Sequence, residues 1–216
     1  MKTPFLVKRI ERGHELSMAD VGAVMANQTE ANTIACLNWP EFTYCPKVTF
    51  RIGHVQDEIW LKFDVSEESV RGLETRMHGD VCRDSCVEFF ISFDRGNYYN
   101  LEVNCIGTVH LGFGPSRHGR KFVTPEIVQK IGVHSTLGDQ PFEEKRGGFD
   151  WSLTLRVPTC VFMFDDLKGL SGRVASANLY KIGDSLAVPH YVSWAPVSTP
   201  KPDYHRPEFF RDIRFG

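Results

Sequence analysis

Two neighbouring strand-like segments constrain the fold of this chain more than any other feature. Residues 84–91 read DSCVEFFI and residues 98–104 read YYNLEVN, and both are rich in the aromatic and apolar residues that favour strands. Between them, residues 92–97 contain Asp94 and Gly96, two residue types that favour turns. Together the segments predict an antiparallel hairpin.

The two faces of this hairpin differ in polarity, because side chains alternate across a strand. Glu88 on the first strand is expected to share a face with Glu102 and Asn104 on the second. The opposite face is apolar and comprises Val87, Phe89, Ile91, Leu101, Val103 and Cys105. A sheet that is apolar behind and carries carboxylates and an amide in front predicts a surface for a polar ligand.

Strand patterns continue along the rest of the chain. Further strands are expected at residues 5–10, 34–39, 48–52, 57–65, 108–113, 127–133, 149–157, 173–182, 190–194 and 209–215. Loops rich in Gly, Pro or charge are expected at residues 66–83, 112–126, 135–148 and 195–208. Ser17 is a helix N-cap candidate, because Val21, Val24 and Met25 follow it on one side of a short helical stretch.

This order of elements predicts an all-β fold. Ten or more short strands with little helix are typical of an antiparallel β-sandwich, jelly-roll-like, here with one short N-terminal helix. No repeat or low-complexity linker interrupts the 216 residues, so a single domain is expected over residues 1–216. A hydrophobic content of 42% and a charged content of 24% suit an ordinary globular core.

Composition also narrows the partners and the compartment. The formal net charge of −2 gives no electrostatic reason to expect nucleic acid or an anionic membrane as a partner. No apolar run approaches the roughly 20 residues that cross a bilayer, so membrane insertion is not expected. The first 15 residues lack the apolar core of a secretory signal, which predicts a cytoplasmic protein, or an extracytoplasmic one if a leader has been removed.

Polar residues gather again in the last third of the chain. Asn178 and Tyr180 are expected on one face of a strand, and Trp194 ends the next. Three prolines between residues 200 and 207 stiffen the loop that carries Tyr204 and His205. A restricted loop loses less entropy when its side chains are fixed against a ligand.

The chain resembles the family 9 carbohydrate-binding modules, and more closely a family-9-like branch common in bacterial polysaccharide-degrading systems. The matching segments are DSCVEFF at 84–90, YYNLEVNCIGT at 98–108, ANLYKIGD at 177–184 and SWAPVSTPKPDYHRPEFF at 193–210. They occur in order from about residue 34 to the end of the chain. The resemblance implies a β-sandwich that holds a sugar end between aromatic rings, without catalysis.

The resemblance also implies roles for particular residues. Glu88 would contact the ligand, Glu102 would stand where a better-known member carries a basic residue, and Tyr204 would be a stacking platform. The strand with Asn178 and Tyr180 would line the same site. The tryptophan that usually precedes the acidic strand is missing, because residues 77–83 contain no aromatic ring except that of His78.

Carbohydrate chemistry agrees with this set of residues. The apolar face of a pyranose packs on an aromatic ring, carboxylates accept from its hydroxyls, and guanidinium groups donate to them. The predicted ligand-binding residues are Glu88, Glu102, Asn104, Asn178, Tyr180, Trp194, Tyr204, His205, Arg83 and Arg117. A few charged hydrogen bonds with one stacking contact predict micromolar to millimolar affinity.

Two other functions use the same surface. Glu88 and Glu102 could be the acid and base of a glycoside hydrolase, although nothing in the sequence indicates a setting that raises the pKa of only one of them. A sandwich that binds another protein is the third interpretation. No catalytic residue, cofactor or metal is predicted; calcium is the weaker alternative, through oxygen ligands from Asp57, Asp64, Asp80 and Asp84.

Overall fold

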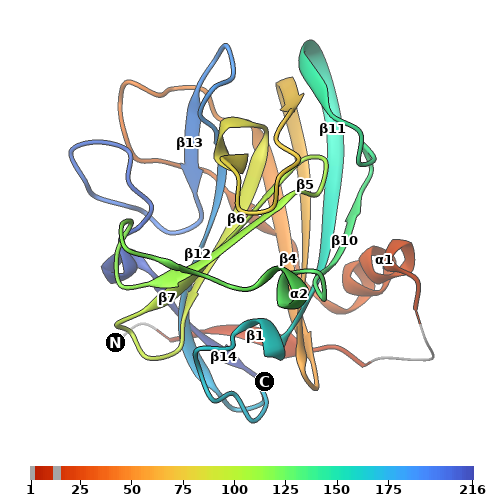
Figure 1. Ribbon diagram of the computed structural model, residues 1–216, viewed down its shortest axis with the longest axis vertical. Coiled ribbons are helices and arrows are strands. Elements are labelled where there is room, and N and C mark those ends of the chain that lie inside the picture. Colours follow the sequence, from red (N-terminus) through yellow and green to blue (C-terminus); the bar gives the residue numbers. More distant parts are fainter. Residues whose placement is uncertain (1–2, 12–15) are drawn as a thin grey trace.

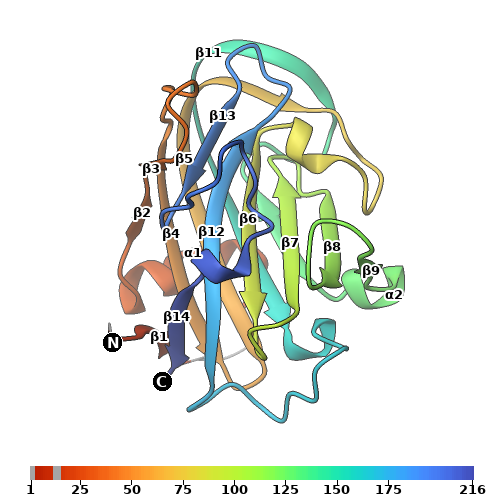
Figure 2. The same ribbon diagram turned by 90° about the vertical axis from the view of Figure 1, so that its left-hand side faces the viewer.

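The computed structural model describes residues 3–11 and 16–216, and its strands form two facing layers (Figures 1 and 2). The first layer has the order β14 (Arg211–Phe215), β12 (Val174–Gly183), β6 (Cys86–Ser92), β7 (Tyr98–Asn104), β8 (Val109–Gly114) and β9 (Lys121–Phe122). On it, β13 (His190–Ser193) pairs with β12 and with the short β3 (Cys36–Leu37).

The second layer has the order β10 (Gly132–Ser135), β11 (Phe142–Pro158), β5 (Glu58–Gly72) and β4 (Lys47–Val55), with β2 (Asn32–Ile34) also paired to β4. The strand β1 (Phe5–Arg9) pairs in parallel with both β4 and β14 and so joins the layers. The other pairings of the described strands are antiparallel. The predicted all-β sandwich is confirmed.

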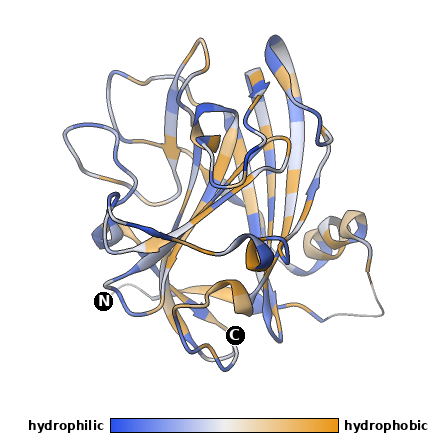
Figure 3. Ribbon diagram, in the orientation of Figure 1, coloured by the Kyte–Doolittle hydropathy of each residue, from blue (hydrophilic) through white to orange (hydrophobic). Residues whose placement is uncertain are grey.

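The main core lies between the layers, as the alternating pattern of the strands predicts (Figure 3). The inward faces of β6 and β7 supply Val87, Phe89, Ile91, Leu101 and Val103, and each of these side chains is at most 1% exposed. The outward face of β6 therefore remains for polar groups and for a second aromatic cluster.

The predicted N-terminal helix is α1 (Met18–Gln28), which packs on the outer side of the second layer (Figure 1). The side chain of Ser17 accepts a hydrogen bond from the backbone N–H of Asp20 at 3.3 Å, which confirms the N-cap. Trp60 lies on the outer face of β5, and Val21 and Met25 of the helix cover it, so that it is fully buried. Neither helix among the described residues is long and apolar enough to cross a membrane.

Several segments differ from the sequence prediction. The segments 66–72 and 142–148 were expected to be loops, but they extend β5 and β11 into one long twisted ribbon with two register shifts. One of these shifts lies at Gly147 and Gly148, between the pairs Arg146–Ser69 and Phe149–Glu67, so a bulge accommodates their poor strand propensity. The segment 127–133, expected to be a strand, divides between the short helix α2 (Pro125–Val128) and β10, because Pro125 starts a helical turn.

A buried ionic cluster joins the layers behind the outward face of β12. Lys181 Nζ on β12 lies 2.8 Å from Glu67 Oε2 on β5, and both side chains have zero exposure. The same ammonium lies 2.7 Å from His190 Nε2, and Glu67 Oε1 accepts from Trp151 Nε1 at 2.7 Å. Such a cluster fixes the two layers in one relative position, since either partner left alone would be a buried charge.

Candidate functional site

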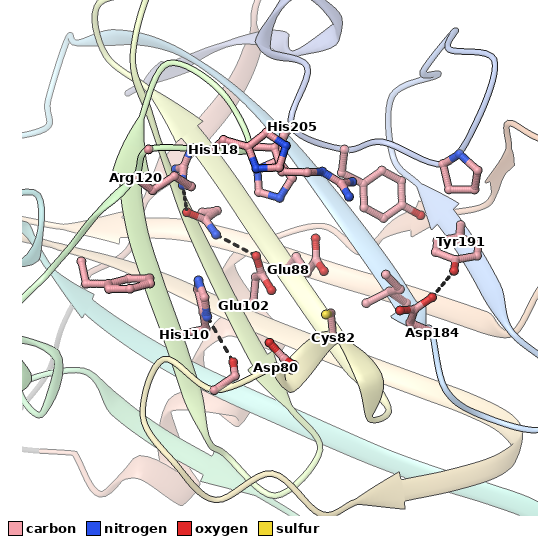
Figure 4. Close-up of a pocket in the computed structure, with 18 residues that line it drawn as sticks. Asp80, Cys82, Glu88, Glu102, His110, His118, Arg120, Asp184, Tyr191 and His205 are labelled. Carbon is pink, nitrogen blue, oxygen red and sulfur yellow. Dashed lines mark hydrogen bonds between the residues drawn. The ribbon is translucent and has the colours of Figure 1, made fainter.

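A row of side chains crosses the outward face of the first layer at one level. Cross-strand pairing places Tyr180 beside Glu88, Glu88 beside Glu102, and Glu102 beside His110. A cavity of about 480 Å³ lies over Glu88, Glu102 and His110, and its size is within the range of small-molecule sites. The predicted acidic face of the hairpin therefore opens into a pocket (Figure 4).

The two glutamates form the floor of the cavity. Glu88 is 3% exposed and Glu102 is 7% exposed, and they are direct neighbours on adjacent strands. Burial, and secondly the nearby Glu102 carboxylate, raises the pKa of Glu88 well above its ordinary value. Within the described residues the Glu88 side chain makes no hydrogen bond or ion pair, so its hydrogen-bonding capacity is directed to the cavity (Figure 4).

A chain of hydrogen bonds fixes Glu102. Asn100 Nδ2 donates to Glu102 Oε1 at 2.7 Å, and Arg120 Nε donates to Asn100 Oδ1 at 2.8 Å (Figure 4). The other guanidinium nitrogens of Arg120 donate to the backbone carbonyls of Tyr98, Gly112, Gly114 and Ser116. Arg120 therefore orients the floor and closes the 115–120 loop over one side of the cavity.

Gly112 leaves the space that this arrangement needs. A Cβ atom there would lie 2.8 Å from Asn100 Oδ1 and 3.1 Å from Arg120 Nε. We expect Gly112→Ala to lower the free energy of unfolding by about 1–3 kcal/mol, the usual cost of overpacking a well-filled site. Urea denaturation measures it. The control is Gly148→Ala, whose Cβ would meet no atom within 4 Å; equal losses in both variants would contradict the close packing.

His205 and Arg117 form the upper wall. Tyr98 Oη lies 2.9 Å from His205 Nδ1, which leaves the Nε2 of the ring available to the cavity. Burial, with Arg120 and Arg117 nearby, lowers the pKa of His205 to about 3, so the ring is neutral near pH 7. Arg117 is paired with Asp203 at 3.1 Å.

Because His190 and His205 are buried in their neutral form, we expect the protein to lose stability in acid. Burial, and then Lys181, lowers the pKa of His190 to about 2, while His205 has a pKa of about 3. The unfolded chain binds protons at these groups below about pH 6.5 and the folded chain does not, so their contribution is complete above pH 6.5. We expect each of the two histidines to lower the free energy of unfolding by about 1.4 kcal/mol for every pH unit between about pH 6 and pH 3.

The control for this prediction is the His205→Gln variant. Urea denaturation between pH 7 and pH 4 should show a shallower pH dependence in that variant than in the unmodified protein. Parallel curves would contradict a neutral, buried His205.

Aromatic rings lie on two sides of the floor. Tyr191 packs edge-on against Phe42 and its hydroxyl donates to Asp184 (Figure 4). Phe122 on β9 is 53% exposed and stacks on His78 with ring centres 4.7 Å apart. These two rings offer apolar surface to a ligand, and Phe122 comes from a strand that the sequence did not single out.

Half of the predicted ligand-binding residues line the cavity: Glu88, Glu102, Arg117, Tyr204 and His205. Tyr204, however, is only 5% exposed, because one face of its ring stacks on Tyr180 at 3.9 Å. Its hydroxyl is buried without a partner among the described groups. Tyr204 therefore borders the cavity with an edge and is not the open platform that the sequence predicted.

The other five predicted residues lie outside the cavity lining. Tyr180 is fully buried beneath Tyr204, and Trp194 packs on Phe5 and Phe50. Arg83 is exposed and lies 3.6 Å from Asp80. These three are corrected to structural or surface positions.

The two asparagines in this group have their hydrogen-bonding capacity taken up by the protein. Asn104 donates to Asp84 and to the carbonyl of Glu74 and accepts from the N–H of Thr108. Asn178 both accepts from and donates to the backbone of Ala195, at 2.9 and 3.1 Å. Both amides hold loops in place and have little left for a ligand.

Several residues that line the cavity were not among the predicted ligand-binding residues: Asp80, Cys82, Asn100, His110, His118, Arg120, Phe122, Asp184 and Tyr191. For Asn100 a signal existed, because it stands two residues before Glu102 and so shares its face. Arg120 and Asp184 reach the cavity from loop positions, and no periodic pattern predicts them.

The aspartates considered for calcium do not gather at one place. Asp84 accepts from the N–H groups of Leu73 and Glu74, and Asp64 pairs with Lys62. Within residues 3–11 and 16–216, no group of three or more His, Cys, Asp or Glu side chains is placed to hold a metal ion. The absence of a metal stays a prediction, with calcium as the weaker alternative, and metal titration would test both.

Comparison with known proteins identifies the family. The sequence profile described as carbohydrate-binding family 9 matches residues 19–215, so the chain belongs to that family. This confirms the resemblance seen in the sequence, and carbohydrate binding is the function that the family assigns. Among curated proteins none matches the chain.

Solved structures agree with this assignment. A candidate carbohydrate-binding protein from Bacteroides uniformis ATCC 8492 has a TM-score of 0.95 and 32% identity over 99% of both chains. A family 9 module from Caldicellulosiruptor kristjanssonii bound to cellotriose has a TM-score of 0.63 and 12% identity over 99% of this chain and 93% of that one. The glucose complex of a family 9 module from the same organism has a TM-score of 0.61 and 11% identity over 99% of this chain and 96% of that one. At such identities the likeness to the Caldicellulosiruptor module concerns the fold.

Proposed function

We propose that the chain binds carbohydrate non-covalently in the cavity over Glu88 and Glu102, without converting it. One observation carries the proposal: the Glu88 carboxyl group is buried, faces the cavity and has no hydrogen-bond partner among the described residues. Because this carboxyl group lines the cavity, a ligand that displaces water from it must supply the hydrogen bonds that the protein does not. Sugar hydroxyls both donate and accept, and Tyr191 and Phe122 add apolar surface at the sides.

Calorimetric titration with a panel of oligosaccharides tests this proposal. The panel includes glucose and cellotriose, the ligands of the structurally similar Caldicellulosiruptor module. We expect at least one sugar to bind with a Kd between about 1 μM and 1 mM, and no release of reducing ends during incubation. Absence of binding across the panel at millimolar concentration would contradict the proposal.

A glycoside hydrolase is the second candidate, and one observation favours it. Burial and the neighbouring Glu102 raise the pKa of Glu88, and a raised carboxyl pKa is what the general acid of such an enzyme needs. The sequence alone gave no reason to expect this shift. Against it, the acid and its partner flank the scissile bond in glycosidases, whereas Glu88 and Glu102 rise side by side from one floor. Release of reducing sugar that Glu88→Gln abolishes would establish the hydrolase instead.

A further inference from the structure

The floor of the cavity holds negative charge that no cation of the protein neutralises by contact. The Glu88 side chain has no ion pair among the described residues, and Glu102 accepts a hydrogen bond from the neutral side-chain amide of Asn100. Adjacent carboxylates on neighbouring strands repel each other. Asp184 adds further negative charge at the edge of the same cavity, and Asp80, also at the edge, is paired with Arg83.

The nearby cations are committed elsewhere. Arg117 pairs with Asp203 at 3.1 Å, outside the floor. Arg120 uses its donors on four backbone carbonyls and Asn100, and its guanidinium carbon lies 4.3 Å from the centre of the Tyr98 ring. Lys181 follows Tyr180 on the strand and so points to the other face, where it pairs with Glu67. None of the three contacts Glu88: Arg117 and Lys181 attract its carboxyl group only from a distance, which opposes the rise of its pKa without cancelling it.

We propose that the sugar bound here carries a free amino group, whose positive charge lies between the Glu88 and Glu102 carboxylates. The inference rests on the proposed function and narrows its ligand to amino sugars. An ammonium group has three donors, enough to serve both carboxylates.

Other sugars fit this floor less well. A neutral sugar hydroxyl brings no positive charge, so Glu88 would have to keep a proton to avoid repulsion by the Glu102 carboxylate. A uronic acid would add a third negative charge. In the empty cavity a proton on Glu88 relieves the repulsion, because burial and Glu102 raise the pKa of this group; the ammonium would take the place of that proton.

Matched sugars test the inference by calorimetry at pH 7 and low salt. The β-1,4-linked glucosamine trimer differs from cellotriose only in amino groups at the 2-positions, and 6-amino-6-deoxyglucose differs from glucose only at position 6. We expect at least one amino sugar to bind ten or more times tighter than its neutral parent. The N-acetylglucosamine trimer should lose this advantage, and added salt should weaken the amino sugar but not its parent.

The Glu102→Gln variant should remove most of the preference, while Glu143→Gln, at an exposed position of β11, should keep it. If cellotriose and glucose bind as tightly as their amino counterparts, the inference is wrong and the proposed function stands. If no sugar binds, the proposed function is wrong and the inference falls with it.

Discussion

Replacing Lys181 by methionine is expected to lower the free energy of unfolding by about 3–5 kcal/mol, which is the usual cost of removing one partner of a buried ion pair. The Glu67 carboxylate would remain buried between the layers with the indole N–H of Trp151 as its hydrogen-bond donor and the His190 ring 3.8 Å away. Because methionine keeps most of the side-chain volume of lysine, the loss of stability measures the effect of removing the charge. Thermal unfolding should show a fall in Tm of roughly 6–20 °C.

Two controls accompany this variant. Lys8→Met removes the exposed ion pair with Glu30, where the side chains are 47% and 82% exposed, and should change stability little. The double variant Lys181→Met with Glu67→Gln should recover part of the loss, because no charge is then left alone. A loss for Lys181→Met no greater than that for Lys8→Met would contradict the role given to the buried cluster.

Replacing Glu88 by glutamine is expected to weaken sugar binding at least tenfold while stabilising the fold. A charged hydrogen bond contributes about 1.5–3 kcal/mol to binding, which corresponds to that loss of affinity. Glutamine cannot ionise, so it escapes the cost of burying a carboxylate beside Glu102. We expect the free energy of unfolding to rise by about 1 kcal/mol at pH 8, a typical gain for a substitution that removes a destabilising group from a functional site.

The sign of the pH effect follows from the direction of the shift. Because the pKa of Glu88 is raised above 4.5 in the folded protein, its stabilising contribution is complete below that pH and is lost as the pH rises toward the folded value. The stability difference between Glu88→Gln and the unmodified protein should therefore be larger at pH 8 than at pH 5. Urea denaturation at both values and calorimetry with the bound sugar measure the two effects. A variant that binds normally, or is less stable at pH 8, would contradict the site.

The strands that define the site were predictable because they alternate strictly. On residues 86–92 and 98–104 one face is apolar and the other polar, and the structure buries them as that pattern requires. The long β5–β11 ribbon was not predictable, since Gly147 and Gly148 have poor strand propensity and lie at a register shift between the pairs Arg146–Ser69 and Phe149–Glu67. Parallel pairing of β1 with two strands depends equally on contacts far apart in the sequence.

The site was predictable where it lies on those strands and not where loops enter it. The positions of Glu88 and Glu102 follow from the alternation of side chains along a strand. Arg120 lies in a loop and Phe122 on the two-residue strand β9, where no periodic pattern predicts that a side chain reaches the cavity. Tyr180 shares the predicted face, but Tyr204 covers it. Alternation indicates which way a side chain points, and only tertiary packing determines whether anything lies above it.

The most direct test of the sugar site is a two-dimensional NMR titration of the backbone amides with a sugar that binds. The account predicts that the largest shift changes occur at residues 79–82, 100–102, 117–122 and 203–205, the segments that surround the cavity. Changes concentrated instead on the outer face of β4, β5 and β11, with the amides around Glu88 and Glu102 unaffected, would contradict it.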